Sequence, residues 1–225
     1  MAPAVALAVV LAALVWLPLF VVVVAGAALG LWRWIGAGAD CVRQSLPGAP
    51  ADPVRDARAL NLLESLSASI GVATPSLLVA PGPAADVAAV GRPTSSVVVV
   101  TQPVLDRLDR LQLEAVFAHE LVQIKDGTTG ARDAAIATWG RLGKAFPYAA
   151  RRCAAVCAVD ARQADVVALG ITRYPPALLA ALVTLRDMAP DQAPPGPASL
   201  RPLWSRHGAP QGETDLRIAV LGELV

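Results

Sequence analysis

The chain has 225 residues, of which 55% are hydrophobic and 16% charged, and its formal net charge is +1. Without its apolar N-terminal stretch it retains about one domain, enough sequence to bury a hydrophobic core. The near-neutral charge gives no electrostatic footprint for DNA or RNA, so we expect no nucleic-acid partner. The three cysteines include no C-x-x-C pair, which argues against a zinc ribbon and favours reduced thiols.

The N-terminal stretch has the composition of a membrane segment. From Ala2 to Trp32 there is no charged residue, and a helix needs about 20 apolar residues to cross a bilayer. We therefore predict that residues 1–35 form a transmembrane anchor, kinked at Pro18. A helical hairpin that turns near Pro18 and a cleaved signal peptide are the alternatives. The signal peptide is disfavoured because no lysine or arginine precedes the apolar run.

The charges that follow the apolar run predict its orientation. Four arginines come after it and none before it: Arg33, Arg43, Arg55 and Arg58. The positive-inside rule then places the rest of the chain on the cytoplasmic side of the cell membrane. Residues 36–55 are rich in glycine, proline and alanine and are predicted to be a linker. Residues 56–225 are predicted to form the folded domain.

The first half of this domain is predicted to contain one helix and three short strands. Apolar residues at helical spacing predict a helix over Asp56–Ile70, which ends at Gly71. Runs of β-branched and apolar residues predict the strands, with a turn at Gly91–Pro93 between the last two. These strands are Ser76–Ala80, Val87–Val90 and Ser96–Thr101.

The second half is predicted to be helical. After a short helix over Pro103–Leu108, Asp109 is expected to cap a helix that runs to about Lys125. A proline-rich loop is expected over residues 189–202. The other predicted helices are Thr129–Ala145, Tyr148–Gly170, Ala177–Met188 and Thr214–Leu224. Together the elements predict an α+β fold that is mainly helical and contains a small β-sheet.

The helix capped by Asp109 carries the residues that suggest chemistry. A zinc-peptidase helix places two histidines at i and i+4 on one face, where both bind one metal. The glutamate after the first histidine acts as general base on a metal-bound water. Here His119 and Glu120 stand in that arrangement, but Gln123 occupies the position of the second histidine.

The surroundings of this motif resemble a known family. The stretch Leu113–Leu121 resembles the active-site helix of the HtpX-like membrane metallopeptidases, and the valine-rich run before it, Val97–Leu108, resembles their lead-in. Other similar stretches are Ile70–Pro75, Thr172–Pro176 and His207–Leu221, the last with Arg217 and Ile218 as a matching pair. This resemblance covers nearly the whole chain. It implies a zincin-like peptidase domain behind a transmembrane helix and a place in protein quality control.

Two departures from the family's pattern fall on the metal ligands. Gln123 offers a neutral amide where the family has an imidazole, which is the better zinc ligand. The family's third ligand, a glutamate, falls on Ala161, which has no donor. Asp160 and His207 are the candidate replacements. Asp165 matches an aspartate that, by the resemblance, orients the first histidine through a hydrogen bond.

A third departure lies on the predicted second strand. Asp86 stands where the family often has an asparagine, at the start of an edge strand. The resemblance implies that this strand, here Asp86, Val87 and Ala88, binds substrate backbone by strand addition.

The sequence therefore predicts a membrane-anchored, metallopeptidase-like protein with a degenerate zinc site. In this hypothesis His119 and Gln123 hold no metal, no cofactor is bound, and Glu120 is a vestigial general base. The cleft would bind a protein partner or a membrane-protein segment without cutting it. The alternatives are an active zinc-dependent endopeptidase with a non-standard ligand set, and a purely structural membrane protein.

Overall fold

The fold is described from a computed structural model for residues 16, 18–33, 41–140, 146–157, 161–188, 192–209 and 212–224. The chain divides into two compact units, Met1–Gly38 and Ala39–Val225. In the first unit residues 18–33 are helical, and their apolar side chains, such as that of Val22, are exposed. None of the described helices combines the length and the apolar character that a membrane span needs. The anchor over residues 1–35 stays a prediction.

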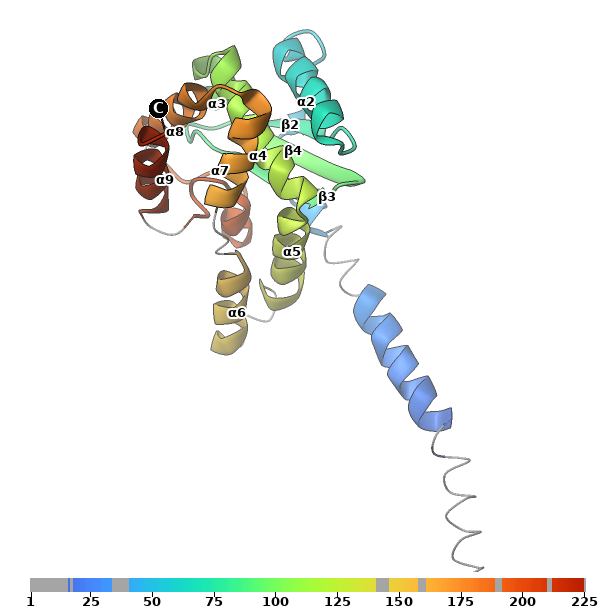
Figure 1. Ribbon diagram of the computed structural model, residues 1–225. Coiled ribbons are helices and arrows are strands. Elements are labelled where there is room, and N and C mark those ends of the chain that lie inside the picture. Colours follow the sequence, from blue (N-terminus) through green and yellow to red (C-terminus); the bar gives the residue numbers. More distant parts are fainter. Residues whose placement is uncertain are drawn as a thin grey trace, which may run out of the picture. The chain divides into compact units, whose positions relative to one another are not determined.

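A four-stranded mixed sheet organises the second unit (Figure 1). Its strands lie in the order β1 (Ala49–Pro50), β2 (Ser76–Ala80), β4 (Ser95–Thr101) and β3 (Val87–Arg92). β2 and β4 are parallel, and the other two pairs are antiparallel. β3 is therefore an edge strand, as the sequence predicted. β1 lies within residues 36–55, so part of the predicted linker belongs to the sheet.

The first helix of this unit lies between β1 and β2 in the chain, and the remaining helices of the unit follow β4. In order they are α2 (Ala57–Ile70), α3 (Gln102–Arg107), α4 (Arg110–Lys125), α5 (Thr128–Ala135), a π-helical turn (Ile136–Gly140), α6 (Pro147–Cys157), α7 (Arg162–Thr172), α8 (Pro175–Asp187), a 3-10 helix (Ala198–Leu203) and α9 (Glu213–Gly222). The mainly helical α+β class is confirmed by this content.

Both faces of the sheet are buried, because side chains alternate between them along each strand. On one face Val98 and Val100 pack into a cluster with residues of α2 and α4. On the other face Val99 packs with Val42 and Trp204. Burial on both faces explains why β4 contains an unbroken run of valines, Val97–Val100.

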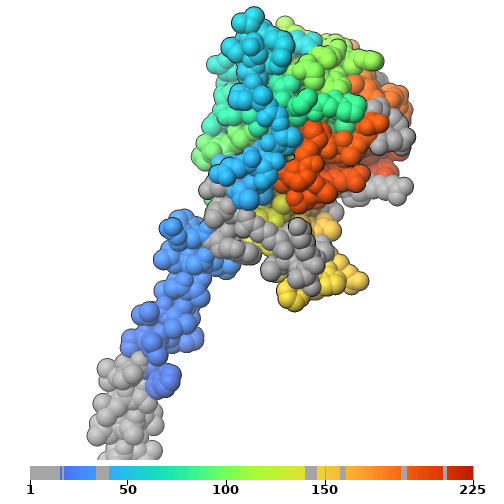
Figure 2. All heavy atoms as spheres, turned by 180° about the vertical axis from the view of Figure 1, so that it is seen from behind, coloured from blue at the N-terminus to red at the C-terminus, as the bar shows by residue number. Residues whose placement is uncertain are grey.

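Two segments far apart in the chain cover the face that carries Val99. Residues 41–50 and 192–209 lie side by side there (Figure 2), and a Cβ added to Gly196 would lie 3.3 Å from Pro47 Cγ. Residues 198–203, all but the last of them within the predicted proline-rich loop, form the 3-10 helix of this cover. Its leucines, Leu200 and Leu203, belong to the buried cluster.

The single helix predicted over Tyr148–Gly170 is wrong. The chain forms α6 and α7 there, and Ala161 lies at the N-terminus of α7. The backbone N–H of Ala161 donates to Glu213 Oε1 at 3.3 Å. This bond comes from a helix 52 residues away, so the local sequence pattern contains no sign of the break.

α4 is the helix that positions the candidate site. It begins with a capping box, in which Asp109 accepts from Gln112 N at 2.8 Å and Gln112 Oε1 accepts from Asp109 N at 3.1 Å. From Leu113 to Ile124 every residue except Glu114 is buried. Polar residues in this stretch therefore lie inside the molecule, where their hydrogen bonds decide what they can do.

Candidate functional site

His119 and Gln123 lie one turn apart on α4 and touch directly. Gln123 Nε2 is 2.5 Å from His119 Nε2, and His119 Nδ1 is 2.7 Å from Asp165 Oδ1. The carboxylate accepts the Nδ1 proton, so we assign Nε2 as the acceptor of the Gln123 N–H. Both ring nitrogens are thus committed, and the His119 side chain is 2% exposed.

Asp165 on α7 and Arg217 on α9 complete a buried cluster around His119. Arg217 donates from Nε and Nη2 to the two oxygens of Asp165, each at 2.7 Å. Burial by itself would raise the pKa of Asp165, but His119 and Arg217 outweigh burial and lower it. A charged carboxylate therefore orients the imidazole, in the position that the resemblance implies.

Glu120, the residue after His119 on α4, is buried as well. Burial raises the pKa of its carboxyl against the opposing effects of His119, Arg132 and Ser205. Its Oε1 has no hydrogen-bond partner among the described residues. A general base must be ionised to take a proton, and burial opposes the ionisation of this carboxyl.

The outer edge of β3 is occupied by the chain's own C-terminal part. Ala88 pairs antiparallel with Trp204, and the N–H of Ser205 donates to Val87 O at 2.8 Å. Trp204 is 3% exposed and belongs to a buried cluster. Residues 204–205 therefore lie along β3 in the place that an added strand would take.

Side chains of α5 close the other end of the same edge. Gly91 N donates to Asp133 Oδ2 at 2.6 Å, and Thr129 Oγ1 donates to Gly91 O at 2.8 Å. Gly91 has a φ of 111°, and a Cβ there would lie 2.4 Å from Ser95 O, so glycine is required. Burial raises the pKa of Asp133 to about 7.

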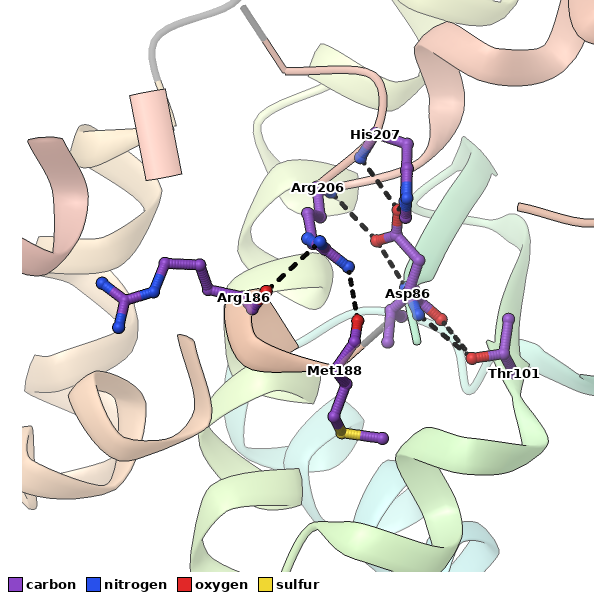
Figure 3. A network of polar contacts seen from close by, with 7 residues as sticks. Asp86, Thr101, Arg186, Met188, Arg206 and His207 are labelled. Carbon is purple, nitrogen blue, oxygen red and sulfur yellow. Dashed lines mark hydrogen bonds and ion pairs between the residues drawn. The ribbon is translucent and has the colours of Figure 1, made fainter. Parts of the chain in front are cut away.

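Asp86 fixes the segment that covers β3 (Figure 3). Its carboxylate accepts from Arg206 N and His207 N, both at 2.9 Å, and from His207 Nδ1 at 2.6 Å. The Arg206 guanidinium donates to Met188 O at 3.1 Å and Arg186 O at 3.3 Å. These carbonyls lie at the C-terminus of α8, where the last carbonyl groups of a helix have no N–H partner within that helix.

Two hollows lie on either side of this segment, and Ser205 lines both of them. The first is small and mainly apolar, and it includes Val116, Leu178 and Leu182 beside His119. The second is equally small and more polar. Its lining includes Gln123, Arg132, Cys157, Ala161, Trp204 and Glu213.

Comparison with known proteins finds relatives that share one name. No family model matches the chain. A protein of Dictyoglomus thermophilum named Protease HtpX homolog is 37% identical over 139 residues, 58% of this chain and 43% of that protein. A Dictyoglomus turgidum protein of the same name is 44% identical over 68 residues, 30% of this chain and 22% of that protein. The chain is HtpX-like. It spans less than half the length of either relative.

In this HtpX-like chain the described residues do not make up a zinc donor set. A catalytic zinc takes three protein ligands and a water, whereas here one imidazole, His119, faces one amide, Gln123, and Ala161 offers a methyl group. Within the described ranges no three His, Cys, Asp or Glu side chains gather as they would around a metal. Asp160 lies outside those ranges, and His207 bonds to another carboxylate.

Sequence reasoning missed two residues of the HtpX-like site. Arg132 on α5 is 6% exposed and lines the second hollow. Glu213 on α9 lines it too, beside Ala161. Neither belongs to a motif: Arg132 lies on α5, which directly follows α4, and Glu213 comes from α9, far along the chain. No local signal could have marked them.

Proposed function

We propose that this chain is a non-catalytic HtpX-like protein that binds a polypeptide partner and holds no metal. The observation that carries the proposal is the direct bond between Gln123 and His119. Two ligands of a tetrahedral zinc lie roughly 3.3 Å apart when each is about 2.0–2.1 Å from the ion. Here Gln123 donates to the imidazole nitrogen that would face an ion, so that nitrogen already has a protein partner.

Metal analysis of the purified full chain tests this proposal. We expect wild-type protein to carry far less than one zinc per chain. The double substitution Gln123→His with Ala161→Glu rebuilds the imidazole pair and the carboxylate, so that variant should take up about one zinc per chain. Adding His119→Ala to it should remove the metal again, which controls for binding elsewhere.

One zinc per wild-type chain that disappears in the single variant His119→Ala would refute the metal-free proposal. Cleavage of an unfolded protein substrate that disappears in Glu120→Gln would refute the absence of catalysis. Both measurements use variants whose side chains differ little in size from wild type, or are smaller. A loss of signal through misfolding is checked by circular dichroism.

A second candidate, an active zinc-dependent endopeptidase, is favoured by the position of Glu213. Its carboxylate lies 3.3 Å from the backbone nitrogen of Ala161 and lines the same hollow as Gln123. In this candidate Glu213 supplies the carboxylate that Ala161 lacks. Zinc that is retained by wild type and lost in Glu213→Gln would favour this candidate.

We infer further that residues 1–35 anchor the chain in a membrane, with the second unit on the cytoplasmic side. The helix over residues 18–33 exposes many apolar side chains, including Phe20 at 65% and Trp32 at 70%. An apolar surface of this extent is normally covered by lipid or protein. The arginines that follow the helix give the orientation.

The polypeptide partner is expected to bind without joining the sheet. Strand addition at Asp86, Val87 and Ala88 would require residues 204–207 to leave the edge of β3. That step breaks the bonds to Asp86 and withdraws Trp204 from its buried cluster. A partner that binds elsewhere on the surface needs no such step.

A further inference from the structure

Three exposed aromatic side chains lie on the helical hairpin that α5, the π-helical turn and α6 form together. Trp139 is 38% exposed, Phe146 60% and Tyr148 63%. The turn and α5 pack against α6, and the hairpin extends away from the sheet (Figure 1). Aromatic side chains this exposed contribute little to the core, and they are typical of a surface that contacts lipid or another protein.

α6 has a buried inner face and a basic outer face. Cys153 and Cys157, one helical turn apart, belong to the buried cluster on one side of the sheet. Arg151 and Arg152 are exposed. Arg152 Nε donates to the Tyr148 hydroxyl at 2.9 Å, and its guanidinium carbon lies 5.6 Å from the ring centre. A cation is thus held beside an exposed aromatic ring.

The charge of the hairpin has a single sign. Between residues 134 and 159 the sequence contains no acidic residue. It has four basic residues there: Arg141, Lys144, Arg151 and Arg152. Among the described residues no ion pair joins Arg151 or Arg152 to a carboxylate. Cations beside exposed aromatic rings are complementary to the anionic headgroup layer of a membrane.

The hairpin also lies close to the point where the chain enters the second unit. Val42 belongs to the same buried cluster as Ile136, Cys153 and Cys157. The predicted anchor ends at residue 35, so only residues 36–40 separate it from Cys41, and such a stretch spans at most about 20 Å. An anchor in the membrane therefore brings the membrane surface within reach of the hairpin.

We propose that the hairpin binds anionic lipid headgroups, with Arg151 and Arg152 on their phosphate groups. A guanidinium pairs with phosphate oxygens, and aromatic rings such as that of Tyr148 favour the zone between headgroups and acyl chains. The arginines keep the hairpin at the surface, because burying their charge in the bilayer is costly. The proposal rests on the membrane anchoring proposed above and adds a second contact, which salt weakens.

Hydroxyl-radical footprinting of the full chain in lipid nanodiscs tests the proposal. One set of discs contains phosphatidylcholine alone, and the other contains phosphatidylglycerol as well. Oxidation of Phe146 and Tyr148 should be roughly threefold or more slower in the anionic discs, because each arginine favours an anionic surface by roughly fivefold. Tyr174, which is 48% exposed outside the hairpin, is the internal control and should react equally in both.

Salt provides a second readout on the same wild-type chain. In about 0.5 M sodium chloride, which screens exposed charges, the protection of Phe146 should disappear. Equal oxidation of Phe146 in the two kinds of disc would overturn the proposal. Protection that is the same in both lipids would also overturn it, because the contact would then need no anionic headgroup.

Substitutions locate the contact. The double variant Arg151→Gln with Arg152→Gln should be oxidised at Phe146 in anionic discs as fast as wild type is in phosphatidylcholine discs. The matched control, Arg107→Gln with Arg110→Gln, removes the same charge from exposed positions on α3 and α4 and should keep the protection. Equal protection in the two variants would overturn the assignment to the hairpin. Circular dichroism checks their folding, and the comparison of lipids on wild type needs no variant.

The outcome is separable from that of the anchor. Insertion of residues 1–35 makes the full chain co-elute with discs of either lipid. Co-elution with both kinds of disc and equal oxidation of Phe146 would defeat this inference alone. Co-elution with the anionic discs alone, with Phe146 protected there, would support the hairpin contact and defeat the anchor.

Discussion

The imidazole of His119 shows how one substitution changes the role of a residue. With Gln123 at the next turn, the Nε2 that would face a metal accepts an amide proton instead. Asp165 and Arg217 continue to orient the ring. Asp165 and Arg217 therefore still hold the ring in place, and the stability that they contribute can be measured.

Arg217→Ala should be strongly destabilising. It leaves the buried Asp165 carboxylate without its bidentate partner, and breaking a buried ion pair in this way costs about 3–5 kcal/mol. The matched control Arg186→Ala removes an arginine that is 41% exposed in its ion pair with Asp187, which should cost about 0–1 kcal/mol. The free energy of unfolding in urea measures both. Equal losses would contradict the role of the buried pair.

The pH dependence of stability should carry a contribution from Asp133. Its pKa in the folded chain is about 7, raised from 3.8 by burial, so the folded state retains a proton that the unfolded state releases between about pH 4 and 7. Stability therefore falls as pH rises through that window, by up to about 1.4 kcal/mol per pH unit. Asp133→Asn should remove this share and keep the bond to Gly91. The exposed Asp187→Asn is the control, and an unchanged slope in Asp133→Asn would contradict the assignment.

At the scale of elements, the decisive arrangement is the segment 204–207 laid along β3. Edge strands present unpaired backbone groups that invite pairing with another chain. Here the outward-facing backbone groups of β3 are bonded within the chain. Ser205 N donates to Val87 O, Gly91 N donates to Asp133, and Thr129 donates to Gly91 O. The fold thereby protects the edge that the family resemblance implied as a substrate strand.

Ser205→Pro should loosen this segment because proline lacks the N–H that bonds Val87 O. We expect the amides of Arg206 and His207 to exchange with deuterium faster in Ser205→Pro than in wild type. Ser205→Ala keeps the N–H and removes only the hydroxyl, so its exchange at these amides should match that of wild type. Hydrogen-exchange mass spectrometry of the peptide that covers residues 204–207 measures the effect. Equal protection in both variants would mean that the main-chain bond does not hold the segment.

For the whole molecule, the exposed apolar helix over residues 18–33 predicts membrane association. The full chain should sediment with membranes and resist carbonate extraction, and a chain that begins at Ala39 should not, because it lacks the apolar surface. Fractionation followed by immunoblotting measures this. Equal sedimentation of both chains would contradict the anchor. The exposed side chains of Phe146 and Tyr148 would then be the next candidates for membrane contact.

The sequence by itself determined most of the elements and the family. Local signals act over a few residues, and here they are strong: the cap at Asp109, the glycine after Ile70 and the valine run of β4 each gave an element close to its observed bounds. The motif at His119 with Gln123 also required only the sequence, because the helical period alone places i and i+4 on one face.

Only the tertiary structure decided what surrounds that motif. The cover of β3 by Trp204 and the pairing of Asp86 with His207 both join residues from distant parts of the chain. The contact between Ala161 N and Glu213 joins distant residues in the same way. Such contacts follow from how helices pack around the sheet, and packing is set by the shapes of all the elements together. No local pattern of residue types therefore encodes them.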